Sequence, residues 1–301
     1  MSDTKQHPSG DAGLLVATGP AYQLAWRDAA VVISGVEASV VSSLARCLAL
    51  PPPVQVLDAP SDVTITRIES AYRIYVGTRQ YDVTCDVDLF MILATLVPAS
   101  LMDKSGVQRR MHAAGIHVGD KLVLISGEGL MGKSSISLMA RLRGYMISGD
   151  DWLLFSDDFT SMLPIPKPLK ARMTPDQFAS LKAQNDLGSA QFGYVFGETR
   201  VLIERDEGFY NDWDRPIPVG TLVFLDRTGC GAAEITPMPV RDALPLLLSQ
   251  TILCKNSQTL AGVAFARQLS ERKVPVYHLN LGGSSPDAAL DAILNVVLSC
   301  G

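Results

Sequence analysis

The sequence has few cysteines, no excess of positive charge and no long apolar run. Its cysteines form no C-x-x-C pair, so we expect reduced thiols rather than a disulfide framework or a zinc site; they are Cys47, Cys85, Cys230, Cys254 and Cys300. The net charge of −5 gives no general attraction to nucleic acid or to an anionic membrane surface. No apolar run approaches the roughly eighteen residues of a membrane span. We therefore expect neither a nucleic-acid partner nor a membrane partner.

A secretory signal is also missing from the sequence. The first thirteen residues, MSDTKQHPSGDAG, are polar and lack an apolar core. We expect residues 1–13 to be disordered and the protein to be cytoplasmic. The 301 residues are enough for one large core or two smaller domains. The sequence allows a homo-oligomer but does not indicate its surface.

Two sections differ in their patterns. Residues 1–105 contain short strand-like runs and two helical segments, 38–50 and 86–96, and predict a small β-rich N-terminal domain. Within it, RIESAYRIYV predicts a hairpin that turns at Glu69-Ser70. Residues 106–301 alternate short apolar strands with amphipathic helices. The predicted fold class is therefore α/β, with a mixed sheet and flanking helices in the second section.

The densest signal lies between Lys121 and Asp151. Residues 122–125 form a short apolar run suited to a buried parallel strand. The next residues, GEGLMGKS, fit the pattern G-x-x-x-x-G-K-[ST], and a helical pattern follows over residues 134–143. Such a loop bends so that its N–H groups point at phosphate oxygens, beside the positive end of the helix. The predicted nucleotide-binding residues are Gly127, Glu128, Gly129, Leu130, Met131, Gly132, Lys133, Ser134 and Ser135.

Two further groups complete the predicted phosphate chemistry. Lys133 adds a mobile charge to the outer phosphates, and the Ser134 hydroxyl can bind Mg²⁺. Asp150 and Asp151 follow one helix and one short strand later, which returns them to the carboxyl edge of the sheet beside the loop. Two carboxylates near a nucleotide phosphate are repelled unless a metal intervenes. We interpret the pair as a Mg²⁺ ligand and a general base, the alternative being a solvated turn.

Other candidates have weaker signals. His112 precedes the phosphate loop and can reach the acidic pair if its segment pairs with the strand before the loop; otherwise it is a core histidine. Arg200 ends a glycine-rich stretch and is the predicted arginine that stabilises the transferring phosphoryl group. A proline-rich segment with basic side chains is either a solvated loop or a contact to nucleotide or substrate; these side chains are Lys167, Lys170 and Arg172.

These residues resemble the HPr kinase/phosphorylase family and its shorter, HPr kinase-related members. The resemblance lies in the lead-in HAAG from His112, the loop GEGLMGKSS, the helix end LRGY, and the pair Asp150-Asp151. It implies a P-loop core of the fold shared with ATP-dependent phosphoenolpyruvate carboxykinases. It also implies that Ser134 and Asp151 hold Mg²⁺, that Asp150 takes the proton of an attacking serine hydroxyl, and that ATP supplies its γ-phosphoryl group.

The loop and the N-terminal section depart from the HPr kinases. Those enzymes usually have serine where Gly129 stands and glycine where Met131 stands, and their second signature is missing here. Residues 1–105 also differ from their usual N-terminal domain. The resemblance is nearer to the shorter kinases of lasso-peptide gene clusters, and it implies a peptide serine as acceptor in preference to an HPr-like protein.

Two rival functions stay open. A small-molecule kinase of the shikimate or gluconate type also places an acidic residue one helix and one strand after its phosphate loop. Such chains are shorter, however, and they begin with the loop. A nucleotide-binding regulatory module would keep Lys133 and Ser134 but would not need Asp150 as a base, so replacing Asp150 separates it from a kinase.

Overall fold

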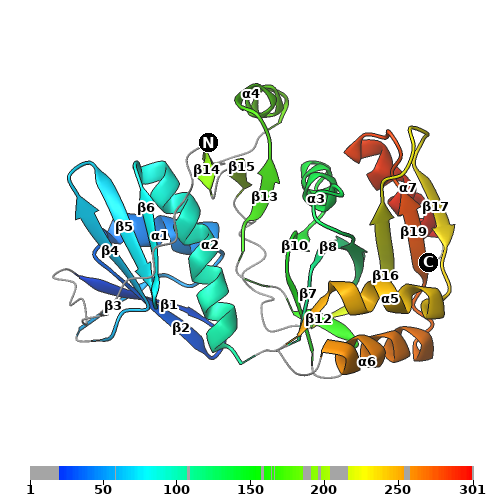
Figure 1. Ribbon diagram of the computed structural model, residues 1–301, viewed down its shortest axis with the longest axis horizontal. Helices are drawn as coiled ribbons and strands as arrows, with labels where there is room; N and C mark the ends of the chain where they lie inside the picture. The colour runs from blue at the N-terminus through cyan, green and yellow to red at the C-terminus, as the bar shows by residue number, and fades with distance from the viewer. Residues whose placement is uncertain are drawn as a thin grey trace. The chain divides into compact units, whose positions relative to one another are not determined.

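The computed structural model describes ten ranges of the chain: 20–57, 59–106, 109–156, 159–163, 165, 167–185, 191–195, 198–203, 216–253 and 258–299. The expected disorder of residues 1–13 lies outside them. The chain forms two compact units, Met1–Gly106 with Pro166–Tyr210 and Val107–Ile165 with Asn211–Gly301. Both combine helices with mixed sheets, which confirms the predicted α/β class (Figure 1). Within these ranges no helix is long and apolar enough to cross a membrane.

A six-stranded sheet forms the centre of the first unit, in the order β3-β1-β2-β4-β5-β6. Its strands are β1 (Ala21–Trp26), β2 (Ala29–Ser34), β3 (Val54–Val56), β4 (Val63–Ile68), β5 (Ala71–Val76) and β6 (Arg79–Val83). The predicted hairpin is confirmed: Ile68 lies opposite Ala71, and Glu69 in the turn has a φ of 54°. Such a left-handed residue is what a tight two-residue hairpin turn requires.

Two helices accompany this sheet, α1 (Ala38–Cys47) and α2 (Asp86–Lys104). The prediction that the second helix ends near residue 96 was wrong, because α2 continues through Pro98. Proline in a helix interior removes a hydrogen bond and is normally unfavourable. Pro98 is nevertheless buried, together with Leu101 and Met102 beyond it. Burial of this apolar turn outweighs the local cost of the proline.

Residues from the middle of the chain also belong to the first unit. Strands β13 (Leu169–Arg172), β15 (Glu198–Ile203) and β14 (Gln191–Val195) form a three-stranded sheet in that order. β14 packs closely on α2, because a Cβ at Gly193 would lie 2.9 Å from Val87 Cγ1. The expected boundary near residue 105 therefore does not separate the units fully. Helix α4 (Pro175–Gln184) begins with a Thr174 cap and has a full capping box with Gln177.

The second unit is built on a ten-stranded mixed sheet. Its long strand β16 (Ile217–Asp226) pairs in parallel with both β9 (Lys121–Ser126) and β19 (Val276–Asn280). Antiparallel β8 (Ala113–Val118) lies on the other side of β9, followed by β10 (Ile147–Gly149). The remaining strands are β7 (Arg109–Met111), β11 (Leu153–Phe155), β12 (Ser161–Leu163), β17 (Glu234–Pro237) and β18 (Thr251–Leu253).

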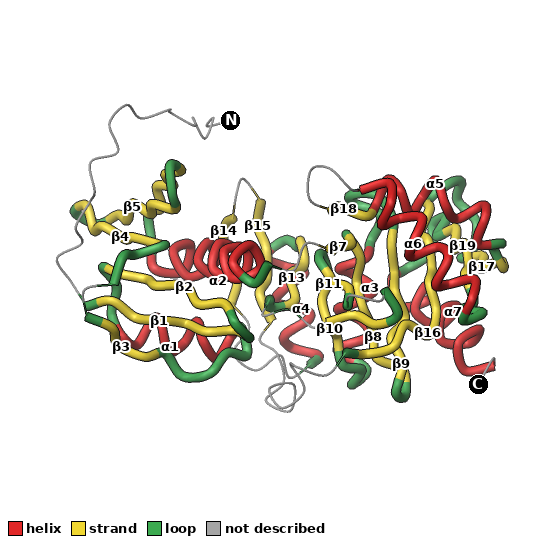
Figure 2. Tube along the Cα trace, turned by 90° about the horizontal axis from the view of Figure 1, so that it is seen from below, coloured by secondary structure: helices red, strands yellow, loops and turns green. Residues whose placement is uncertain are grey.

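Helices cover both faces of this sheet. Apolar residues of α3 (Lys133–Leu142) and α7 (Pro286–Ser299) share one buried cluster with alternate residues of β9. Residues of α5 (Val240–Gln250) and α6 (Gln258–Glu271) share a second cluster with the other residues of β9. Helices α5 and α6 run side by side (Figure 2). β9 is therefore buried on both faces, as its apolar run predicts.

Candidate active site

The loop between β9 and α3 begins at a glycine that lies tightly against the neighbouring strand. A Cβ at Gly127 would lie 3.1 Å from both the Cβ and the carbonyl oxygen of Leu225 on β16. At the other end, Gly132 has a φ of 99° and is the N-cap of α3. These two positions explain the spacing of the glycines: one permits close contact with the neighbouring strand and the other starts the helix. The predicted strand, loop and helix are confirmed.

Lys133 is buried under this loop, with 6% of its surface exposed. Its Nζ donates hydrogen bonds to the carbonyl oxygens of Gly127 at 2.6 Å and Glu128 at 2.9 Å. Burial lowers the pKa of Lys133 from its ordinary value, and the negative charges of Asp151 and Asp150 act in the opposite direction. The ammonium and both carboxylates are thus close enough to interact electrostatically. The predicted lysine and acidic pair lie at one site.

The sheet register brings His112 to the same place. Ala113 on β8 pairs with Ser126 on β9, so His112 lies beside the beginning of the loop. The Ser126 hydroxyl donates to the carbonyl oxygen of His112 at 3.5 Å. This is the pairing on which the functional interpretation of His112 depended. β10 runs antiparallel to β8. The chain that follows β10 therefore lies at the end of the sheet where His112 and the loop lie.

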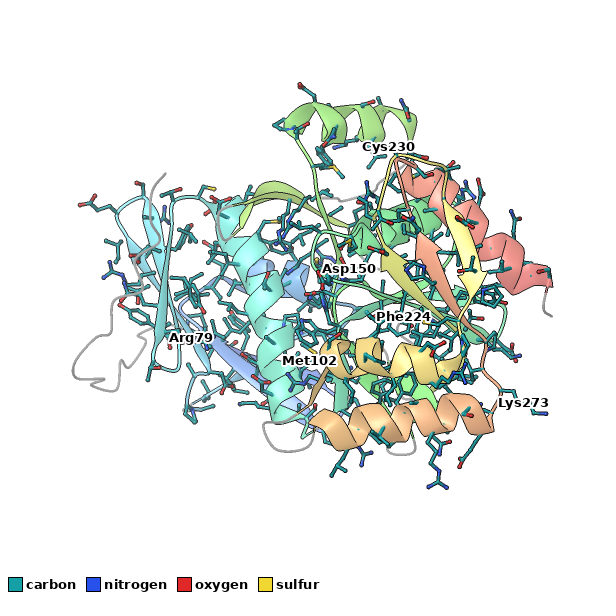
Figure 3. The ribbon with its side chains drawn as sticks, turned by 45° about the vertical axis from the view of Figure 1, so that its right-hand side comes forward. Arg79, Met102, Asp150, Phe224, Cys230 and Lys273 are labelled. Carbon is teal, nitrogen blue, oxygen red and sulfur yellow. The ribbon has the colours of Figure 1, made fainter. Side chains whose placement is uncertain are left out.

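His112 contacts the second acidic residue. Its Nε2 lies 3.2 Å from Asp151 Oδ1, and its ring lies 5.7 Å from that of Trp152. Asp150, which follows β10 and is labelled in Figure 3, is buried with 3% of its surface exposed, whereas 43% of the Asp151 side chain is exposed. A buried carboxylate and an accessible one therefore adjoin the loop. This difference suits a proton acceptor and a metal ligand, respectively.

The oxygen groups at this site fit a magnesium ion. Ser134 lies in the first turn of α3, and its hydroxyl and the Asp151 carboxylate are both hard oxygen ligands. Mg²⁺ usually takes one or two such groups from the protein and completes its shell with water and phosphate oxygens. The loop amides and Lys133 would face the same phosphates. The residues therefore fit ATP with Mg²⁺ as a group, and their individual roles stay predictions.

The other predicted residues belong to the first unit. Lys170 on β13 is buried and donates a hydrogen bond to Thr95 Oγ1 of α2, so the solvated-loop interpretation is wrong for this lysine. Lys167 is also buried. Arg172 and Arg200 lie opposite each other on β13 and β15. Whether any of these side chains meets the loop of the second unit stays a prediction.

Sequence reasoning missed three residues at this edge of the sheet: Asp226, which ends β16, Arg227, which follows it, and Asn280, which ends β19. Asp226 Oδ2 lies 3.8 Å from His278 Nε2, and Asn280 Oδ1 accepts hydrogen bonds from the backbone N–H groups of Thr228 and Gly282. Arg227 lies beside the phosphate loop: a Cβ at Gly132 would be 3.7 Å from its Nη2. The available signal was the apolar run VGTLVFLD at residues 219–226, because ligands bind at the carboxyl ends of such buried strands.

Comparison with solved structures finds proteins of similar structure. No family model matches the chain, and no curated protein matches it. Among solved structures, the HPr(Ser) kinase/phosphatase from Coxiella burnetii aligns with 14% sequence identity and a TM-score of 0.25, over 55% of this chain and 98% of that chain. At that identity and TM-score, the function must be inferred from the residues of this chain.

Proposed function

We propose that this protein is an ATP- and Mg²⁺-dependent kinase that transfers a γ-phosphoryl group to a serine hydroxyl of a peptide or small protein. One observation carries the proposal: a buried lysine under a glycine-bounded loop interacts with two carboxylates at the same sheet edge. Phosphate binding alone would not require a buried carboxylate there, since that charge repels phosphate. A base for an attacking hydroxyl explains it.

The roles follow from the positions of the groups. The loop amides and Lys133 hold the outer phosphates, and Ser134 and Asp151 hold Mg²⁺, which supplies charge neutralisation when bound. His112 keeps the Asp151 carboxylate oriented through its 3.2 Å contact. Asp150 accepts the hydroxyl proton while the serine oxygen forms its bond to the γ-phosphorus. The bond from that phosphorus to the bridging oxygen breaks, and ADP leaves with the electron pair.

The acceptor class comes from the sequence resemblance. The lead-in at His112, the loop and the acidic pair are the features shared with HPr kinase-related proteins. On that basis we propose the C-terminal serine of a lasso-peptide precursor as the preferred acceptor and an HPr-like protein as the second. A small-molecule hydroxyl is the rival, and the experiment below separates these acceptors.

The test follows γ-labelled ATP with Mg²⁺ and a low-mass peptide fraction from the source cell. We expect Asp150→Asn to bind ATP normally and to lose label transfer by about 10²–10⁴-fold, the usual effect of removing an acid–base group. Asp120→Asn is the matched control. It makes the same change in the turn between β8 and β9, at the opposite end of β9 from the loop. This control should transfer label like the wild type.

Each outcome has a distinct meaning. Label on a peptide serine with the wild type and the control, but not with Asp150→Asn, supports the kinase and identifies its acceptor. Label on a small metabolite instead favours the small-molecule rival. If Asp150→Asn transfers normally, Asp150 is no base. ATP binding without transfer by any variant favours the regulatory module.

A further inference from the structure

Arg227 lies on the second flank of the phosphate loop. In the parallel pairing of β16 with β9, Phe224 lies opposite Ser126, which places the chain after β16 level with the loop. The contact between Leu225 and Gly127 continues this register. At the far end of the loop, the Arg227 Nη2 lies 3.7 Å from where a Cβ of Gly132 would be. The guanidinium is therefore within reach of the N-terminus of α3.

The backbone around Arg227 is held in place while its side chain is not. The Arg227 N–H donates to Asp226 Oδ1 at 2.7 Å, and the next N–H, of Thr228, donates to Asn280 Oδ1 at 3.0 Å. Farther along this loop, which Cys230 marks in Figure 3, the Gly231 carbonyl accepts from Gly283. Among the described residues, the exposed guanidinium has no hydrogen bond or ion pair. A fixed backbone thus presents a charge that can bind an anion.

The strand order determines on which side of the loop Arg227 lies. The sheet runs β10-β8-β9-β16, with the loop after β9. Asp150, Asp151 and His112 come from β10 and β8, on one flank of the loop, whereas Arg227 comes from β16, on the other. A phosphate chain lying in the loop with its transferring end toward Asp150 would extend its ribose end toward Arg227.

We propose that Arg227 is a second cationic ligand of the bound nucleotide and contacts the phosphates nearer the ribose. This inference rests on the proposed function, because it requires a nucleotide in the loop. A guanidinium can bind two phosphate oxygens at once, which a lysine ammonium cannot do with the same geometry. A contact to phosphates that ADP retains stabilises the ground state and the transition state alike. Arg227 therefore raises nucleotide affinity and does not alter the rate of transfer.

The experiment measures ATP and ADP affinity by calorimetry and transfer at saturating ATP, in the full chain. We expect Arg227→Gln to weaken ATP and ADP binding alike, by about 10-fold or more, with kcat unchanged. Arg227→Lys should recover part of the affinity. Arg241→Gln is the control: it removes the same charge from an exposed arginine of α5, the helix that packs on the opposite face of the sheet from α3. That variant should bind both nucleotides like the wild type.

Three results would overturn the inference. If Arg227→Gln binds both nucleotides normally, Arg227 is not a ligand, and the proposed function is untouched. If it loses affinity for ATP but not for ADP, the guanidinium contacts the terminal phosphate instead. If the wild type binds neither nucleotide, the proposed function fails and the role of Arg227 fails with it. Equal unfolding temperatures of the wild type and Arg227→Gln would show that the variant is folded.

Discussion

At the residue scale, Lys133 combines a structural cost with a proposed role in phosphate binding. Its ammonium is buried, and carbonyl groups of its own loop provide its hydrogen bonds. Neutral carbonyls compensate only partly for the loss of water around a charge, which is why the pKa of Lys133 is lowered. A bound phosphate would supply the full negative charge that neutral carbonyls cannot. Burial of this ammonium therefore costs stability, which a bound anion would offset.

The lowered pKa makes the contribution of Lys133 to stability depend on pH. Between its folded-state pKa and the ordinary 10.5, the unfolded chain binds more protons than the folded one, so the free energy of unfolding rises with pH. Below the folded-state pKa the cost of burying the charge is fully present. We therefore expect the wild type to gain stability relative to Lys133→Met as the pH rises toward 10.5, as measured by denaturant unfolding.

The control for this prediction is Lys121→Met. Lys121 is exposed at the beginning of the same strand, β9, and the substitution has the same chemistry. The stability difference from the wild type should depend more strongly on pH for Lys133→Met than for Lys121→Met. If Lys133→Met behaved like Lys121→Met, the ammonium of Lys133 would be fully solvated in solution.

The residues of the site differ in how far sequence could predict them. The phosphate loop was predictable because its residues are contiguous and the spacing of Gly127, Gly132 and Lys133 is a local pattern. His112 and Asp151 were predictable only as a conditional pair, since their contact depends on β8 lying next to β9. Arg227 was missed because nothing local shows that β16 is the other neighbour of β9. Strand order is set by packing over long sequence distances.

At the element scale, one arginine connects the helix after the phosphate loop to the C-terminal helix. Arg143, at the end of α3, donates to Asp291 and Asp287 of α7, with both nitrogen–oxygen distances 2.6 Å. The two aspartates are one helical turn apart and so lie on one face of α7. This contact holds α3 at the end opposite to the loop. Together with the apolar packing of α3 and α7 in one cluster, it helps to orient α3.

Removing this arginine should lower stability in an acid-sensitive way. The hydrogen bond from Arg143 lowers the pKa of Asp291 below its ordinary 3.8. The stabilisation is fully present above that value and is lost as the pH falls through the folded-state pKa. We expect Arg143→Gln to unfold at a lower temperature than the wild type at neutral pH, and the difference to vanish in acid, as measured by calorimetry.

An intrahelical pair provides the comparison for Arg143→Gln. Arg267 and Glu271 on α6 have the same 2.6 Å geometry but connect residues of a single helix. Exposed pairs of that kind contribute little. Arg267→Gln should therefore lower the unfolding temperature less than Arg143→Gln. Equal effects of the two variants would mean that Arg143 does not connect the helices in solution.

The elements themselves were largely predictable where local chemistry decides. The start of α4 followed from Thr174 and Pro175, and the β4–β5 turn followed from the residues on both sides of it. The end of α2 was not predictable, because Pro98 locally favours the end of a helix. The apolar residues around it are buried and continue the helix. Local propensity fails where tertiary packing supplies more free energy.

At the scale of the whole molecule, the first unit is assembled from two segments of the chain. The segment near residues 166–210 adds β13, β15 and β14 to the fold of residues up to Gly106. A prediction made along the sequence places a single boundary between two sections. It therefore misses a later segment that belongs to the first unit. The sequence contains only a weak signal that this segment joins the first unit, because the segment is short and its partner, α2, lies far earlier in the sequence.

This division predicts that the second unit can bind nucleotide alone. A chain in which a flexible Gly/Ser linker joins Ile165 to residue 216 keeps all ten strands and four helices of that unit. We expect it to unfold cooperatively and to bind ADP with the affinity of the full chain, as measured by calorimetry. Because Arg200 lies in the omitted segment, phosphoryl transfer should be lost. Transfer at the normal rate would exclude a role for Arg200.

The strand order also determines when the phosphate loop can first become stable during translation. β9 and the loop are synthesised early in the second unit, but β16, which contacts Gly127, comes only after the whole inserted segment. Until then β9 has β8 on one edge and no partner on the other, although its apolar residues need cover on both faces. Nascent chains halted before Ile217 should therefore depend on chaperones and be unable to hold a nucleotide.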